Sequence, residues 1–115
     1  MRYFIGLFFL FSAATSNAYL LLGSELANQM KEYDKAEVSS KDTSYYEVGQ
    51  YTGFVAGVYD AYDINEIICS GKHVTRGQVY AVVAKFLRNN PERWDEPAFF
   101  LVSDALKKAF PCASK

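Results

Sequence analysis

Apolar residues recur every three to four positions in four separate segments of the chain, and polar residues fill the positions between them. This spacing places the apolar side chains on one face of a helix, whereas a half-buried strand would alternate at every second residue. The predicted helices cover Leu20–Lys35, Asp42–Asp63, Thr75–Asn89 and the segment from Asp95 to Phe110. The pattern therefore predicts a small all-α domain of four helices, with no strand and no internal repeat.

Local signals mark the ends of these helices. Thr75 and Gln78 form a capping box, with Thr75 as the N-cap and Gln78 at the third helical position. Ser24 is expected to cap the first helix. Pro91 and Pro111 end the third and fourth helices, because a residue before proline avoids the helical conformation. The polar residues of the fourth helix form one narrow stripe, so we expect this helix to be the core element, surrounded by the others.

The second predicted helix carries a stripe of small residues at intervals of four, namely Gly49, Gly53, Gly57 and Ala61. Glycine in a helix costs about 1 kcal/mol relative to alanine, so several on one face need a reason. A stripe without side chains lets another backbone approach closely. The partner is predicted to be either another helix of the same domain or a helix of a second subunit, in which case the protein is a homodimer.

The first eighteen residues have the pattern of a secretory signal peptide. A positive charge at Arg2 precedes an apolar run from Tyr3 to Phe11, and small residues lead to a cleavage site after Ala18. We predict residues 1–18 as a cleaved signal for the Sec pathway and residues 19–115 as a single domain. Export to the periplasm would place Cys69 and Cys112, the only cysteines, where disulfides persist, so we expect them to pair.

Composition narrows the classes of partner. Half of the residues are hydrophobic, and 13 acidic residues against 12 basic ones give a net charge of −1. A nearly neutral chain with scattered basic residues is a poor ligand for nucleic acid or for an anionic membrane. No apolar stretch after the signal is long enough to cross a membrane, so the mature protein is expected to be soluble.

Catalytic and metal-binding patterns are weak. His73 is the only histidine, and a disulfide would leave no free thiolate for it to activate. Asp60, Asp63 and Glu66 lie near one helix end, where they form a solvated acidic patch, a docking surface for a basic partner or, least in favour, a calcium site; they lack the loop pattern of calcium sites. We expect no enzyme, no cofactor and no metal.

Two connections are candidate surfaces for binding another protein. The first follows the second helix and is held by Cys69, and the second includes Trp94, the only tryptophan, as an aromatic anchor. A connection that is rigid before binding loses less entropy when a partner binds. The candidate residues are Asp63, Asn65, Glu66, Ser70, Lys72, His73, Glu92, Arg93 and Trp94.

The segment from Gly49 to Cys112 resembles the Rap/Tai family of immunity proteins from type VI secretion systems. The matching residues are Gly53–Val58 with Asp60, Cys69, Val74–Gln78, Val82-Val83, Phe86-Leu87, Asn90–Glu92 and Ala109–Cys112. The resemblance implies an exported, disulfide-bridged helical protein, often dimeric, that binds and blocks a peptidoglycan-cleaving amidase injected by a sibling cell. The alternative is a small periplasmic chaperone of the acid-stress type, which would expose apolar surface as its carboxylates become protonated.

Overall fold

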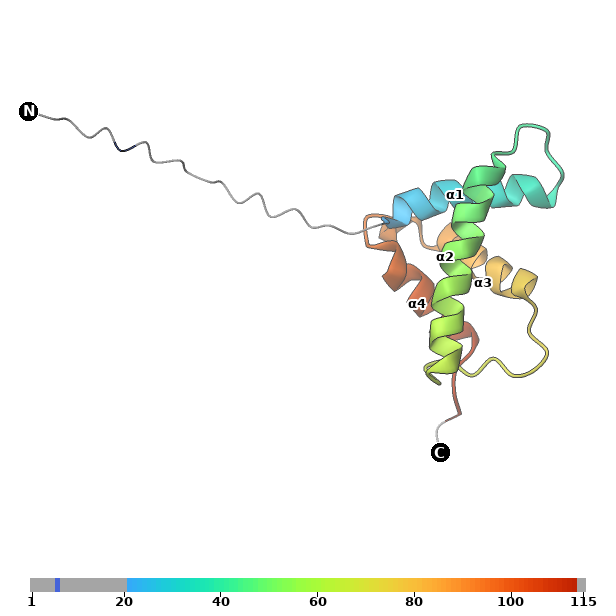
Figure 1. Ribbon diagram of the computed structural model, residues 1–115, viewed down its shortest axis with the longest axis vertical. Helices are drawn as coiled ribbons and strands as arrows, with labels where there is room; N and C mark the ends of the chain where they lie inside the picture. Colours follow the sequence, from blue (N-terminus) through green and yellow to red (C-terminus); the bar gives the residue numbers. More distant parts are fainter. Residues whose placement is uncertain (1–5, 7–20, 114–115) are drawn as a thin grey trace, which may run out of the picture.

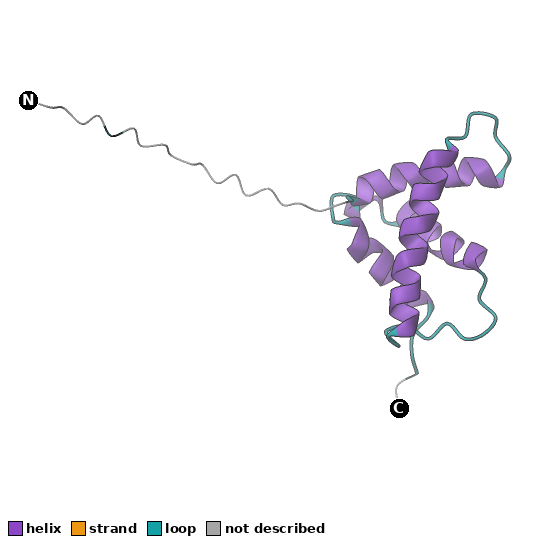
Figure 2. Ribbon diagram, in the orientation of Figure 1, coloured by secondary structure: helices purple, strands orange, loops and turns teal. Residues whose placement is uncertain are grey.

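The computed structural model describes residue 6 and residues 21–113, and within these residues the chain forms four α-helices joined by loops (Figures 1 and 2). The helices are α1 (Gly23–Glu37), α2 (Tyr45–Ile64), α3 (Arg76–Asn89) and α4 (Ala98–Ala109), with a short 3-10 turn, η1 (Pro91–Arg93), before α4. Described residues form no strand apart from one isolated bridge between Leu22 and Pro97. The all-α, four-helix prediction is confirmed. The predicted signal peptide falls, except for Gly6, outside the described residues.

The longest helix, α2, crosses α1 with its own first turns and then runs past α3 and α4 (Figure 1). The four helices thus enclose one core. The side chains of α4 that point inward are fully or almost fully buried: Ala98, Leu101, Val102, Ala105 and Leu106. The prediction that α4 is a core element is therefore right for this face. It is wrong for Phe99 and Phe100, which are 44% and 50% exposed because they lie on the outer side of the first turn.

The predicted capping box of α3 is present. The hydroxyl of Thr75 accepts a hydrogen bond from the backbone of Gln78 at 3.2 Å, and the side chain of Gln78 accepts one from the backbone of Thr75 at 2.8 Å. These two bonds satisfy backbone donors that the first turn of a helix otherwise leaves unpaired.

The start of α1 differs from the prediction, because Ser24 is not its cap. The backbone N–H of Gly23 donates to the carbonyl of Glu96 at 2.8 Å, and that of Ser24 donates to the carbonyl of Trp94 at 2.7 Å. The segment before α4 thus supplies the acceptors that a capping side chain would supply elsewhere. This pairing joins the beginning of α1 to the beginning of α4.

The glycine stripe of α2 faces away from the rest of the domain. A Cβ atom placed at Gly49, Gly53 or Gly57 would meet no atom within 4 Å, and Ala61 is exposed. The opposite face of the helix carries the buried Tyr51, Val55 and Tyr62. The described domain therefore does not use the stripe for helix packing, and that alternative of the sequence prediction is wrong.

The predicted disulfide between Cys69 and Cys112 is present, with 4.8 Å between the Cα atoms and 43 residues between the two cysteines in sequence. It joins the loop after α2 to the segment after α4. The backbone N–H of Cys69 also donates to the carbonyl of Phe110 at 2.9 Å. None of the helices within residues 21–113 has the length and apolar character of a membrane span.

Candidate functional site

The two predicted binding surfaces lie at opposite ends of α4. Residues 65–75 and their disulfide are next to its C-terminal end, and residues 90–97 lead into its N-terminal end. A helix of 12 residues is about 18 Å long, so the two groups do not converge on one site. We describe them separately as the bridged loop (residues 65–75) and the α3–α4 turn (residues 90–97).

The bridged loop begins with an unusual backbone conformation. Asn65 ends α2, and Glu66 follows with a φ of 55°, in the left-handed region that glycine usually occupies after a helix. A residue with a side chain is uncommon in this conformation. The sulfur of Cys112 lies 3.6 Å from the carbonyl oxygen of Glu66, so the disulfide lies directly against this backbone. The exposed side chain of Glu66 therefore projects from a backbone that the disulfide contacts directly.

Side chains of α2 hold the middle of the bridged loop. The hydroxyl of Ser70 is hydrogen-bonded to the hydroxyl of Tyr59 and donates to the carboxylate of Asp63 at 3.1 Å. The ring of Tyr59 packs edge-on against Phe110, with centroids 6.1 Å apart. These contacts give Ser70 and Asp63 a role in shaping the loop. Asn65, Lys72 and His73 remain exposed on its surface.

Two isoleucines near the bridged loop extend the surface that the sequence predicted. Ile64 is 80% exposed and Ile67 is 45% exposed, whereas Ile68 is buried at 1%. The two neighbouring isoleucines of the bridged loop therefore point in different directions, Ile67 toward solvent and Ile68 into the core. Exposed large apolar side chains beside polar ones are typical of protein-binding surfaces.

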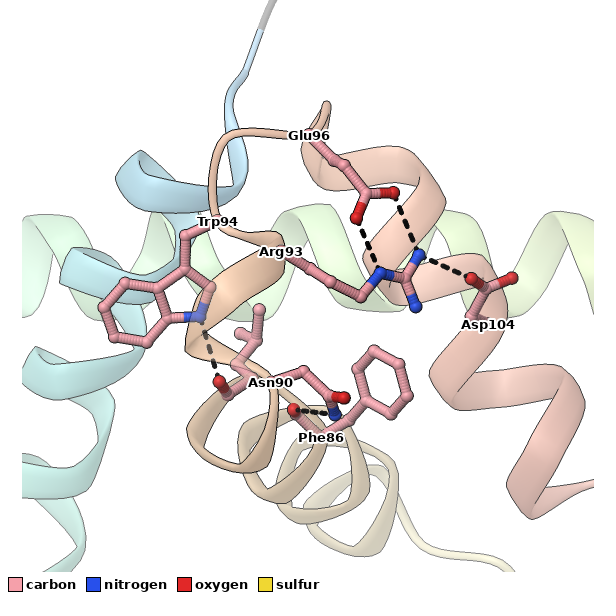
Figure 3. A network of polar contacts seen from close by, with 7 residues as sticks. Phe86, Asn90, Arg93, Trp94, Glu96 and Asp104 are labelled. Atoms are coloured by element: carbon pink, nitrogen blue, oxygen red, sulfur yellow. Dashed lines mark hydrogen bonds and ion pairs between the residues drawn. The ribbon is translucent and has the colours of Figure 1, made fainter.

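In the α3–α4 turn, Arg93 is the centre of an ion-pair network (Figure 3). Its guanidinium donates two hydrogen bonds to the carboxylate of Glu96, at 2.6 and 3.0 Å, and one to Asp104 of α4 at 2.7 Å. Donation to the carboxylates of Glu96 and Asp104 raises the pKa of Arg93, and the bonds that Glu96 accepts from Arg93 lower the pKa of Glu96. Arg93 is partly buried, and its Nε and Nη2 atoms are engaged by these partners, so it orders the turn.

Trp94 is held by the same turn and points the other way (Figure 3). Its indole N–H donates to the carbonyl of Leu87 at 2.9 Å, and its ring packs against the buried core. The ammonium group of Lys31 lies 5.3 Å from the ring centroid. Of the three candidate residues in this turn, Glu92 alone is exposed, and a partner would reach it before it reached Trp94.

Asp60, Asp63 and Glu66, near the end of α2, are the candidate calcium ligands of the sequence. Among residues 21–113 no three histidine, cysteine, aspartate or glutamate side chains are close enough together to hold a metal ion. Asp60, Asp63 and Glu66 therefore do not form the calcium site that we had considered.

A shallow groove follows the exposed face of α2, a surface that the glycine stripe indicated in part. Its volume is about 600 Å³, and it is lined by Tyr45, Tyr46, Gly49, Gln50, Gly53 and Phe54. The rings of Tyr45 and Tyr46 are 68% and 76% exposed. We refer to this surface as the tyrosine–glycine face.

Comparison with known proteins identifies the family of the chain. The model of the Rap1a immunity proteins matches residues 23–112, which includes all four helices and both cysteines. No curated protein matches the sequence. Because the match covers most of the chain, the chain belongs to the Rap1a immunity protein family.

Proposed function

We propose that this member of the Rap1a immunity family is a periplasmic protein that binds and blocks a peptidoglycan amidase delivered by a type VI secretion system. Family membership supports the immunity role. The secretory pattern of residues 1–18 supports a periplasmic location, and amidases of this kind act in that compartment. The producing cell would thereby be protected from the toxin of its siblings.

The disulfide-anchored bridged loop is the observation on which the proposal depends most. Inhibition by occlusion needs a rigid protrusion and no chemistry of its own. The loop is fixed by the disulfide, by the hydrogen bond between Cys69 and Phe110 and by the contacts of Ser70. A loop that is already ordered loses little entropy when it enters a cleft. We propose Asn65, Glu66, Lys72 and His73 as its contact residues, with Ile64 and Ile67 beside them.

The proposal is tested by producing the protein in the periplasm together with the amidase encoded beside it. We expect the cells to survive and the two proteins to elute together from a sizing column. A charge-reversed loop, Glu66→Arg with Lys72→Glu, is expected to weaken the complex, because it exchanges both charges while the net charge stays constant. The matched control is Glu37→Arg with Lys41→Glu, two exposed residues around the α1–α2 connection. Lysis of cells that make the unaltered protein, with no complex on the column, would refute the immunity function.

Localisation has its own test. Mass spectrometry of the exported product is expected to show a chain that begins at Tyr19 and contains no alkylatable thiol. An intact leader or two free sulfhydryl groups would argue against the periplasmic proposal.

We further propose that the tyrosine–glycine face of α2 joins two copies of the chain. Because the described domain leaves Gly49, Gly53 and Gly57 uncovered, a second α2 can approach this face closely. The exposed rings of Tyr45 and Tyr46 would then supply contact area at little cost in side-chain entropy. Sedimentation should show a dimer that Gly53→Leu disrupts and that Gly77→Leu, in the first turn of α3, leaves intact.

A further inference from the structure

A hollow between α3 and α4 adjoins the α3–α4 turn only through Asn90 and is otherwise lined by residues of the two helices. Its volume is about 490 Å³, within the range of ~300–1,000 Å³ that is usual for ligand sites. The C-terminal halves of the two helices form its walls, and its apolar side includes Val82, Phe86 and Ala105. We call it the α3–α4 groove. Neither the disulfide nor the glycine stripe contributes to it.

Two lysines give the groove its charge. Lys85 comes from α3 and Lys108 from α4, so the two ammonium groups approach the groove from different helices. Both side chains are exposed, and within residues 21–113 neither takes part in an ion pair. No carboxylate lines the groove.

The network around Arg93 explains why Lys108 remains unpaired. Asp104 is four residues before Lys108 on α4, which is the spacing at which opposite charges on a helix normally meet. The carboxylate of Asp104 instead accepts a hydrogen bond of 2.7 Å from Arg93 (Figure 3). Lys85 has no acidic residue three or four positions away on either side. The fold thus leaves two positive charges beside an apolar surface.

The groove also offers polar atoms suited to a peptide backbone. The side-chain N–H of Asn90 donates to the carbonyl of Phe86 at 2.8 Å, which fixes the orientation of its amide. In the described part of the chain its side-chain carbonyl has no donor, and the neighbouring Asn89 is exposed. A carbonyl acceptor and an exposed amide match the N–H and C=O groups of an extended segment.

From these contacts we infer that the α3–α4 groove binds an acidic peptide segment of a protein partner, with carboxylates at Lys85 and Lys108 and apolar side chains against Phe86. Charge complementarity selects an anion, and the apolar wall selects one with apolar neighbours. Nucleic acid is disfavoured, because two lysines on a chain of net charge −1 give little attraction for a phosphate backbone. The inference goes beyond the proposed function and holds whatever the toxin is.

The test is an NMR titration of the 15N-labelled protein, with its disulfide intact, with a terminally blocked peptide containing Glu-Leu-Glu. Amide signals on both walls of the groove are expected to shift, and the Gln-Leu-Gln counterpart is expected to leave them unchanged. The variant Lys85→Glu with Lys108→Glu should bind the acidic peptide roughly tenfold more weakly, since two favourable contacts become repulsive.

The matched control is Lys41→Glu with Lys107→Glu, which changes the net charge equally at exposed residues outside the groove. Lys107 is in the same turn of α4 as Lys108 but lies 5.8 Å from the ring centroid of Tyr62. This control should keep the affinity within about twofold of the original. A milder variant, Lys85→Gln with Lys108→Gln, removes the charges should the reversed variant fail to fold, and its spectrum reports whether the fold is kept.

Three results would overturn the inference. The first is that the Glu-Leu-Glu and Gln-Leu-Gln peptides bind equally well or that neither binds. The second is that the groove variant and the control variant lose the same amount of affinity for the acidic peptide. The third is the same set of shifts with inorganic phosphate alone, which would make the groove a simple anion site. None of these outcomes depends on an amidase, so the groove and the immunity function can fail independently.

Discussion

A methyl group added to Gly23 would lie 2.5 Å from the Cδ1 atom of Leu101, and 3.0 Å from the carbonyl oxygen of Glu96. Among the described glycines, Gly23 leaves the least room for a side chain, because α1 and the beginning of α4 lie closest together there. The hydrogen bond from its N–H to Glu96 holds the two elements in this contact.

Gly23→Ala is expected to destabilise the protein by about 1–3 kcal/mol, because the added methyl group would meet the buried Leu101 and also backbone atoms of Glu96 and Trp94 at 3.0 Å. Urea denaturation would measure the loss. Gly77→Ala is the control, since the added methyl group would have only an ordinary contact of 3.9 Å with Thr75. An unchanged midpoint for Gly23→Ala would show that the contact between α1 and α4 relaxes freely.

Gly53→Ala should have the opposite effect on the isolated subunit. The position is helical and open, so the substitution removes backbone freedom from the unfolded chain and stabilises by up to about 1 kcal/mol. Thermal denaturation at low protein concentration, where a dimer dissociates, is the measurement. Destabilisation under these conditions would mean that an atom of the same chain covers this face.

Removing the disulfide by replacing Cys69 and Cys112 with serine is expected to lower the free energy of unfolding by about 4 kcal/mol. The estimate follows from the entropy of closing a loop of 43 residues in the unfolded chain. Both cysteines are exposed, so serine disturbs little packing. Denaturation of the double-serine variant, compared with the parent protein before and after reduction, provides the value. A loss below about 1 kcal/mol would remove the basis for a rigid bridged loop.

Tyr62 and Ser103 form a polar pair inside the core, and their hydrogen bond is expected to contribute about 1 kcal/mol. The hydroxyl of Tyr62 donates to that of Ser103 at 2.8 Å, and both residues are buried. A double-mutant cycle with Tyr62→Phe and Ser103→Ala isolates the interaction. Strictly additive effects of the two substitutions would contradict this assignment.

Stability should fall in acid, because two carboxylates have lowered pKa values in the folded state. Hydrogen bonds from Lys35 and from the backbone of Ser44 lower the pKa of Glu32, and the bond from Arg93 lowers that of Glu96. A lowered pKa stabilises the folded state above the ordinary glutamate pKa of about 4.3, and this stabilisation is lost as the pH falls through the folded value.

Urea denaturation at a series of pH values between neutral and about 3 would follow this change. Glu96→Gln is expected to flatten part of the dependence, whereas Glu92→Gln, at an exposed residue of the same turn, serves as the control. Equal curves for the parent protein and Glu96→Gln would contradict the role of Arg93. Loss of fixed structure with dye binding at low pH would instead favour an acid-activated chaperone.

Local signals made most of the fold predictable. The capping box of Thr75 and Gln78 and the stop at Pro91 concern neighbouring residues, so their effect does not depend on the rest of the molecule. The disulfide was predictable because two cysteines allow only one pairing. The start of α1 was not predictable, because its caps are backbone carbonyls from Trp94 and Glu96, and every sequence has carbonyls.

The candidate binding surfaces were also predictable only in part. Their residue types could be recognised in the sequence, but the ion pair of Arg93 with Asp104 depends on how the turn packs against α4, and the hydrogen bond of the Trp94 indole to Leu87 depends on how it folds back on α3. The α3–α4 groove had no local signal, since Lys85 and Lys108 are distant in the chain.

By itself, the sequence determined where the helices form, which faces are apolar and which sulfurs can join, because periodicity, caps and cysteine number act locally or without alternatives. Only the tertiary structure decided which glycine is closely packed, which face of α2 stays uncovered and which lysines lack a carboxylate partner. These properties depend on distances between helices, and contacts across the core set those distances.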